Sequence, residues 1–144
     1  MYWIIEGIGL NADEIRPYIN TEKIARFFYG QWQYHDSELE AMISSGDYSG
    51  FDMDDYLEGG DIDDLGDVLY YCDDTDTLSS GDDGRGNAYF YYPPSMPWHL
   101  RENDPKSEQE VIERITAAVQ KITDMTAEEI EPLIKDLYVV GNDG

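Results

Sequence analysis

The feature that most limits how this chain can fold is a long stretch without positive charge. Between Arg26 and Arg85 there is no Lys or Arg, whereas residues 27–84 carry 17 Asp and Glu side chains. Blocks of one charge are normally disordered tails. This block also contains large apolar side chains that require a core, namely Phe51, Met53, Tyr56, Leu57, Ile62, Leu65, Leu69 and Tyr70. The stretch must therefore fold while it leaves its carboxylates in water.

The composition is that of a folded protein with an unusual charge. The chain has 144 residues, of which 41% are hydrophobic and 13% aromatic, and we expect a single domain over residues 1–144. Its 32 acidic and 9 basic residues give a formal net charge of −23. Such a charge repels nucleic acids and anionic membranes. We therefore expect a basic protein partner, no direct nucleic-acid binding and no membrane association.

The sequence lacks motifs for export, cofactor binding and catalysis. The apolar start at Met1–Leu10 contains Glu6, has no basic flank and is too short to span a membrane. The single Cys72 cannot form an internal disulfide, and His35 and His99 do not complete a zinc-binding spacing. No nucleophile elbow, phosphate loop or HExxH helix is present. We expect a cytoplasmic protein that is not an enzyme and has no cofactor or metal.

The predicted strands come from runs of aromatic and β-branched residues. Residues 2–9 have this composition without a helical stripe, so we place them near the centre of a sheet. Residues 68–72 and 88–92 flank a polar segment, which is typical of an antiparallel hairpin with a long loop. Residues 137–140 predict the last strand.

The predicted helices are short, apart from one over residues 107–122 whose apolar side chains share a face. Shorter helices or single turns are expected over residues 12–19, 21–29, 37–46, 52–58, 62–65 and from residue 126. Capping boxes are predicted at helix starts for Asn11 with Glu14, Ser37 with Glu40, Ser107 with Glu110 and Thr126 with Glu129. These elements predict an α+β fold with a small, mainly antiparallel sheet of about four strands and helices packed on one side.

The acidic segment 36–83 is the candidate binding face. Duplex DNA carries one charge per ~1.7 Å of axis, so 17 carboxylates match about 29 Å of duplex, or roughly nine base pairs. A compact domain of this length is roughly 35 to 40 Å across, so one face can present that charge. The candidate partner-binding residues are Asp47, Tyr48, Phe51, Asp52, Asp54, Asp55, Tyr56, Glu58, Asp61, Asp63, Asp64, Asp67, Asp73, Asp74, Asp76, Asp82 and Asp83.

In size and charge the chain resembles the acidic nucleic-acid mimics made by phages and mobile elements, which are the anti-CRISPR and antirestriction proteins. The resemblance covers the overall charge and the segment 36–83, and it includes no shared motif. It implies a non-enzymatic inhibitor in the cytoplasm of a bacterial host cell. Such an inhibitor blocks the basic nucleic-acid-binding channel of a CRISPR effector nuclease or a restriction enzyme.

Two other functions fit the same acidity. Ca²⁺ takes oxygen ligands, and Asp61, Asp63 and Gly66 follow part of the EF-hand pattern. However, Leu65 replaces a ligand, and Cys72 stands where that pattern requires a bidentate Glu. An adaptor that binds a basic protein would share the electrostatics of an inhibitor. A Ca²⁺-binding protein or an adaptor is therefore the alternative to the inhibitor.

The crowded carboxylates predict that salt stabilises the fold at neutral pH. Salt screens repulsion between exposed charges, with a Debye length of about 30 Å at 0.01 M and about 10 Å at 0.1 M ionic strength. We expect the melting temperature, followed by circular dichroism, to rise as NaCl increases over that range. A melting temperature that does not change would contradict a clustered negative surface.

Overall fold

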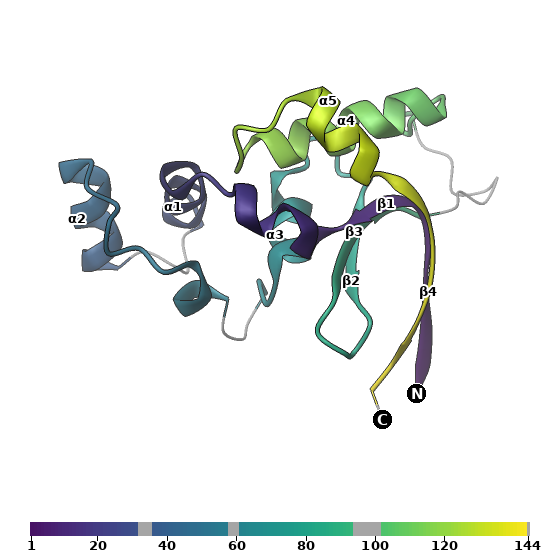
Figure 1. Cartoon of the computed structure of the whole chain (residues 1–144), viewed down its shortest axis with the longest axis horizontal. Coiled ribbons are helices and arrows are strands. Elements are labelled where there is room, and N and C mark those ends of the chain that lie inside the picture. The colour runs from purple at the N-terminus through teal and green to yellow at the C-terminus, as the bar shows by residue number, and fades with distance from the viewer. Residues whose placement is uncertain (32–35, 58–60, 94–101, 144) are drawn as a thin grey trace.

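The fold is built on one sheet of four antiparallel strands (Figure 1). The strand order is β2-β3-β1-β4, with β1 at Tyr2–Asn11, β2 at Ser79–Asp82, β3 at Ala88–Tyr92 and β4 at Lys135–Asn142. The structure, a computed structural model, describes residues 1–31, 36–57, 61–93 and 102–143, so the candidate residue Glu58 and both histidines lie outside the described residues. The sheet confirms the predicted α+β class and the inner position of the first strand.

Helices pack on the face of the sheet that carries Leu10 and Phe90, both fully buried. The α-helices are α1 Thr21–Tyr29, α2 Ser37–Ser45, α3 Leu65–Cys72, α4 Glu108–Gln120 and α5 Ala127–Ile130. The 3-10 helices are η1 Ala12–Tyr18, η3 Met53–Tyr56 and η5 Glu131–Leu133. Apolar side chains of α3 and α4, such as Leu69 and Ile115, close this core against the sheet.

The predicted hairpin between residues 68–72 and 88–92 is wrong. Residues 68–72 belong to helix α3 because Leu65, Val68, Leu69 and Cys72 fall on one buried helical face. The strand that pairs with β3 is β2, which lies in the segment predicted to be a polar loop. Its Ser-Ser-Gly-Asp sequence has weak strand propensity, so pairing with β3 determines its conformation.

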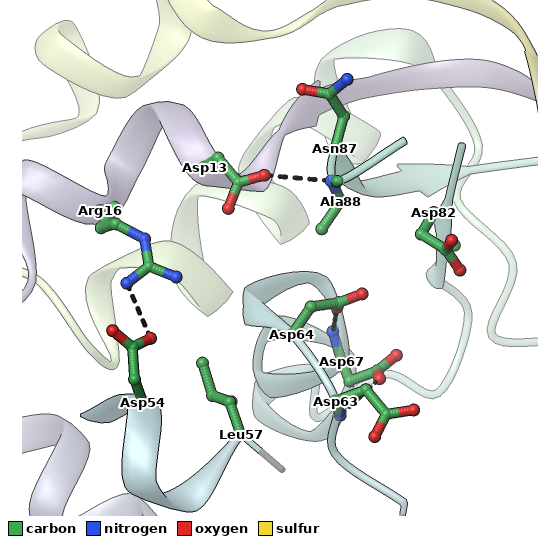
Figure 2. Close-up of a pocket in the computed structure, with 12 residues that line it drawn as sticks. Asp13, Arg16, Asp54, Leu57, Asp63, Asp64, Asp67, Asp82, Asn87 and Ala88 are labelled. Carbon is green, nitrogen blue, oxygen red and sulfur yellow. Dashed lines mark hydrogen bonds and ion pairs between the residues drawn. The ribbon is translucent and has the colours of Figure 1, made fainter. Parts of the chain in front are cut away.

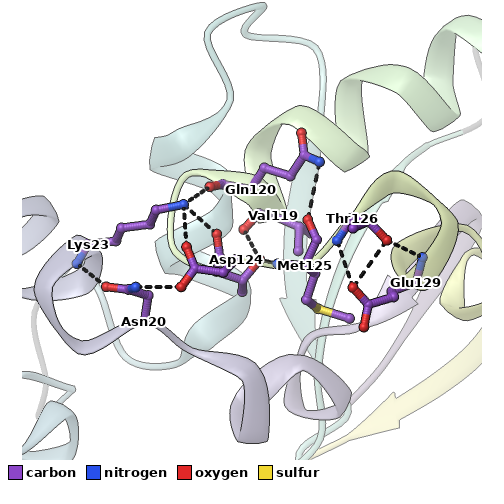
Figure 3. Close-up of polar contacts among 9 residues, drawn as sticks. Asn20, Lys23, Val119, Gln120, Asp124, Met125, Thr126 and Glu129 are labelled. Atoms are coloured by element: carbon purple, nitrogen blue, oxygen red, sulfur yellow. Dashed lines mark hydrogen bonds and ion pairs between the residues drawn. The ribbon is translucent and has the colours of Figure 1, made fainter.

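Of the capping boxes predicted for α4 and α5, the one at α5 is confirmed in full and the one at α4 only in part. Thr126 and Glu129 form a complete capping box at the start of α5 (Figure 3). Ser107 accepts a hydrogen bond from the amide of Glu110 at 3.1 Å. The Glu110 carboxylate, however, accepts from the amide of Lys106. The helix start is as predicted, but the reciprocal bond is displaced by one residue.

The two earlier capping predictions are wrong in detail. Asp36, one residue before Ser37, caps α2, since its Oδ1 accepts from the amide of Leu39 at 2.6 Å. Asn11 does cap a helix, but it accepts from the amide of Asp13 at 2.9 Å and begins a 3-10 helix. At α2 the cap lies one residue earlier than predicted, and at η1 the capping bond spans two residues instead of three.

The N-terminal helices are fastened to the end of α4 by one lysine (Figure 3). Lys23 Nζ donates to the carbonyl of Thr123 at 2.6 Å and to that of Gln120 at 3.2 Å. It also lies 3.1 Å from Asp124, whose other oxygen accepts from Asn20 Nδ2 at 2.6 Å. A cation is favourable at these carbonyls because the helix dipole is negative there. This joint holds α1, and the acidic segment that follows it, on the body of the domain.

The sheet is curved, so that the turn after one edge strand, β2, contacts the end of the other edge strand, β4. Trp3 Nε1 donates to the carbonyl of Asp82 at 2.7 Å, and the amide of Asn142 donates to the carbonyl of Asp83 at 3.2 Å. Gly84 makes this approach possible, since it has a φ of 75° and a Cβ there would lie 2.2 Å from the Asn142 oxygen. The turn between β2 and β3 is therefore held against the end of β4.

Gly84→Ala should destabilise the fold more than Gly86→Ala, a matched change in the same turn. Both glycines have positive φ, 75° and 94°, so each alanine costs roughly 1–2 kcal/mol in backbone conformation. Only at Gly84 does the added Cβ collide with β4, whereas nothing lies within 4 Å of it at Gly86. Urea unfolding measures both losses, and equal losses would show that the contact with β4 is not stabilising.

Candidate functional site

A cleft of about 590 Å³ lies where η1, η3, the start of α3 and the β2–β3 hairpin meet (Figure 2). We call it the acidic cleft, because Arg16 is the one cation among its described lining residues. Its six carboxylates belong to Asp13, Asp54, Asp63, Asp64, Asp67 and Asp82. The structure thus brings together five candidate residues from the acidic segment and one aspartate from outside it.

One wall of the acidic cleft is the start of α3, where the carboxylates of two aspartates accept hydrogen bonds from backbone amides. Asp64 caps the helix and accepts from the amide of Asp67 at 2.9 Å. Asp67 accepts from the amide of Asp63 at 3.0 Å and, through its other oxygen, from the Ser80 hydroxyl of β2 at 2.8 Å. These bonds fix Asp64 and Asp67 in place and join α3 to the sheet.

The opposite wall comes from η1 and η3. Asp13 Oδ2 accepts from the amide of Ala88 at 3.1 Å, which ties η1 to the start of β3. Arg16 Nη1 lies 3.1 Å from Asp54 Oδ1, and both side chains are largely exposed. An exposed ion pair contributes about 0–1 kcal/mol, so this pair positions Asp54 more than it stabilises the fold.

Asp64 is the most perturbed carboxyl of the cleft. Burial raises its pKa to about 6, the amide of Asp67 opposes the shift, and the negative charges of Asp67, Asp82 and Asp13 raise it further. Half-buried carboxyls without a cationic partner hold their proton more tightly for this reason. The net negative charge of the cleft therefore varies with pH around neutrality.

The candidate residues between α2 and α3 are exposed outside the cleft. Asp47, Asp52 and Asp55 lie on the segment that runs from α2 through η3, and Asp61 precedes α3. Two of them also shape the backbone, since Asp47 accepts from the amide of Ser49 and Asp52 from that of Asp54, each at 3.0 Å. The hydrogen bonds from Ser49 hold the pKa of Asp47 below its usual value.

Three candidate residues lie at the other end of α3, away from the cleft. Asp74 pairs with Lys121 of α4, and Asp76 has a left-handed φ of 56°. Burial opposes ionisation of Asp73, but hydrogen bonds from Thr75 and the amides that follow hold its pKa below the usual value. The structure therefore gives Asp73 partners within its own loop and Asp74 a partner at the end of α4.

Asp83 also faces inward and is 5% exposed. It accepts from the amides of Arg85 and Asn87 at 2.8 and 3.1 Å and from the Asn87 side chain at 2.7 Å. All of these bonds lie within the turn between β2 and β3. The carboxylate of Asp83 therefore shapes this turn and is not presented to solvent.

The three aromatic candidates anchor the acidic segment to the core. The ring of Tyr56 stacks on Phe28 and Phe51, with centroid distances of 5.2 and 5.3 Å. Its hydroxyl donates to Asp36 Oδ2 at 3.2 Å. The hydroxyl of Tyr48 is buried without a hydrogen-bond partner among the described residues. Tyr48, Phe51 and Tyr56 are all partly buried, so each offers only part of its surface to a partner.

Sequence reasoning missed Asp13 and Arg16, because both precede the stretch that lacks cations. Contacts of η1 with α3 and β3 bring them to the cleft across a sequence separation of about 50 residues or more. Asp13 stands in the first turn after the Asn11 cap, where an acid is ordinary. The sequence therefore contains no separate signal for its place in the cleft.

Within the described part of the chain, the structure contains neither a cluster of metal ligands nor a membrane-spanning helix. There, no group of three or more His, Cys, Asp or Glu side chains is placed to hold a metal ion. Several carboxylate oxygens of the cleft accept from backbone amides instead. No helix in the same residues is both long and apolar enough to cross a membrane.

Comparisons with known proteins assign no family. No family model, curated protein or solved structure matches the chain. The geometry of the acidic cleft and its surroundings is therefore the basis for a function.

Asp64→Asn should stabilise the fold, by an amount that grows with pH. Asn caps a helix as well as Asp does, so the bond to the Asp67 amide is kept and the charge is removed. The pKa of Asp64 is about 6 in the folded state against an ordinary value of 3.8. The aspartate therefore costs no stability below about pH 4, and the cost develops as pH rises through 6.

The measurement is the difference in melting temperature between Asp64→Asn and the parent chain, from about pH 4 to pH 8. We expect a small difference at the acidic end and a larger one at the alkaline end. A difference that stays constant with pH would contradict a raised pKa at Asp64.

Proposed function

We propose that the chain is a non-enzymatic inhibitor whose acidic surface occupies the basic nucleic-acid-binding channel of a CRISPR effector nuclease or a restriction enzyme. The acidic cleft is the centre of this surface, and the exposed Asp47, Asp52, Asp55 and Asp61 extend it. Its charge matches a channel that binds phosphates, so binding of the inhibitor and of nucleic acid exclude each other.

The observation that supports this proposal best is that six carboxylates gather around one cleft whose described lining includes a single arginine. Asp13, Asp64 and Asp67 are held by backbone amides or hydroxyls, so they lose little freedom when a partner binds. Arg binds carboxylates and phosphates through the same planar pair of N–H donors. A fixed set of carboxylates is therefore a suitable substitute for phosphates in an Arg-lined channel.

Within the segment 36–83 we assign the partner contacts to a smaller set of residues. Asp73, Asp74 and Asp83 bond to local partners on the other side of α3 or inside a turn. We assign these three residues a structural role. The contacts with the partner are then made by the acidic cleft and by the segment between α2 and α3. The rings of Phe51 and Tyr56 anchor that segment to the core, because Phe51 stacks on Tyr56 and Tyr56 stacks on the buried Phe28.

Reversing three exposed charges, Asp55→Lys, Asp61→Lys and Asp63→Lys, should abolish inhibition. Their side chains are exposed, so the fold should be kept. If each reversal costs about 1 kcal/mol of binding, the total of about 3 kcal/mol weakens affinity on the order of 100-fold. The assay is DNA cleavage by a purified, guide-loaded CRISPR nuclease, and in parallel by a purified restriction enzyme, with increasing inhibitor.

The matched control is Glu108→Lys, Glu113→Lys and Glu128→Lys, which makes the same change in net charge on exposed positions of α4 and α5. It should inhibit like the parent chain, and circular dichroism should show that both variants are folded. Equal weakening by both sets would indicate attraction to net charge alone. Inhibition unaffected by either set, against an enzyme that the parent chain inhibits, would contradict docking through the acidic cleft.

A further inference from the structure

The strand β4 lies at an edge of the sheet, and its outer side is open. Among the described residues it pairs with β1 alone. The amide of Asp143 donates to the carbonyl of Met1, next to β1, at 3.4 Å. The amide of Asn142 points away from β1 and donates to the carbonyl of Asp83 at 3.2 Å. Because these directions alternate along an antiparallel strand, the backbone N–H and C=O groups of the even-numbered residues of β4 point away from β1. The backbone groups of residues 136, 138 and 140 therefore point away from the sheet.

The same residues belong to an exposed apolar stripe. Tyr138 and Val140 are 66% and 45% exposed, and Tyr2 and Ile4 of β1 are 72% and 54% exposed. Ile4 lies directly opposite Val140 in the register, so the side chains share a face. We call the outward backbone of residues 136–140, together with these four side chains, the β4 edge.

Among the described residues, Asp136 is the one charged side chain within residues 136–140 of the β4 edge, so little protects this edge from pairing with another strand. Folded proteins blunt such edges with lysine, proline or a bulge. Residues 136–140 read Asp-Leu-Tyr-Val-Val, and their register with β1 is continuous. Both the backbone and the apolar side chains are therefore open to a further strand.

The charges on this face determine which strand it can accept. Glu6 stands opposite Tyr138, and Asp136 completes the same face, so both charges there are negative. Lys135 is odd-numbered, lies on the other face and pairs with Glu14 at 3.8 Å. A second copy of the chain would bring the same two acids and another net charge of −23, so it is repelled, whereas a basic segment is attracted.

We propose that the β4 edge binds an extended basic segment of a partner protein by strand addition. The backbone of the segment pairs with residues 136, 138 and 140, its apolar side chains cover Ile4, Tyr138 and Val140, and its Lys or Arg side chains reach Glu6 and Asp136. This surface shares no residue with the acidic cleft, and the proposal does not depend on the inhibitor function.

The probe is an acetylated and amidated peptide of eight residues, Thr-Lys-Thr-Val-Thr-Val-Thr-Lys, whose Lys and Val side chains all lie on one face of a strand. Amide hydrogen exchange, followed by NMR, reports the site. We expect exchange at residues 136, 138 and 140 to slow at least tenfold when the peptide is saturating. The amides of Leu137 and Val139 face β1 in the ladder, so they should change little. The same peptide with both Lys residues replaced by Glu should produce no protection.

Two variants with the same charge change separate this site from general attraction. Tyr138→Lys with Val140→Lys should abolish the protection, whereas Tyr18→Lys with Tyr70→Lys, at two exposed tyrosines elsewhere, should leave it unchanged. Perturbation only around the acidic cleft, or no binding of the peptide, would overturn the proposal. Dimerisation of the chain through the β4 edge, seen by light scattering together with protection of the same amides without peptide, would overturn it as well.

Discussion

Hydrogen bonds from backbone amides to aspartate side chains hold the acidic part of the molecule together. Asp36, Asp52 and Asp64 each accept such a bond at the start of a helix, and Asp73 and Asp83 each accept several within a loop. Hydrogen bonds to a charged acceptor are stronger than neutral ones, and the short side chain of Asp reaches its own backbone readily. These five aspartates therefore contribute both to the charge of the chain and to its fold, so at these positions the two cannot be varied independently.

The same segment is anchored by apolar side chains that alternate with the acids. Leu39, Ile62 and Leu65 are fully buried, whereas the neighbouring Glu40, Asp61 and Asp63 are exposed. Gly66 allows α3 to lie close to the sheet, because a Cβ there would be 2.8 Å from the Tyr89 carbonyl. A stretch that has the composition of a disordered tail in its charges is thereby fixed to the core, and its carboxylates are presented from a defined surface.

Local signals predicted the elements whose sequence and surroundings agree. The apolar stripe of α4 and the β-branched composition of β1 lead to the structures observed. Strand β2 was not predictable in this way, since Ser79–Asp82 becomes a strand only through its pairing with β3. Part of helix α3 was predicted as a strand because the aromatic residues near its end favour a strand. The helical spacing of Leu65, Val68 and Cys72 was given less weight. The sequence predicted the negative charge of the acidic cleft but not which residues line it, because the position of Asp13 depends on contacts between distant parts of the chain.

The pairing of β1 with β4 joins Tyr2 to Asn142, which are almost the whole chain apart. Contacts between such distant residues form slowly, because a long loop must close first. During translation, residues 2–7 of β1 have no strand partner until residues 137–142 have been synthesised. The acidic middle of the chain emerges in that interval, and its charge repels neighbouring nascent chains on the same messenger. We expect this repulsion to keep the unpaired first strands of neighbouring nascent chains from pairing with each other before the sheet forms.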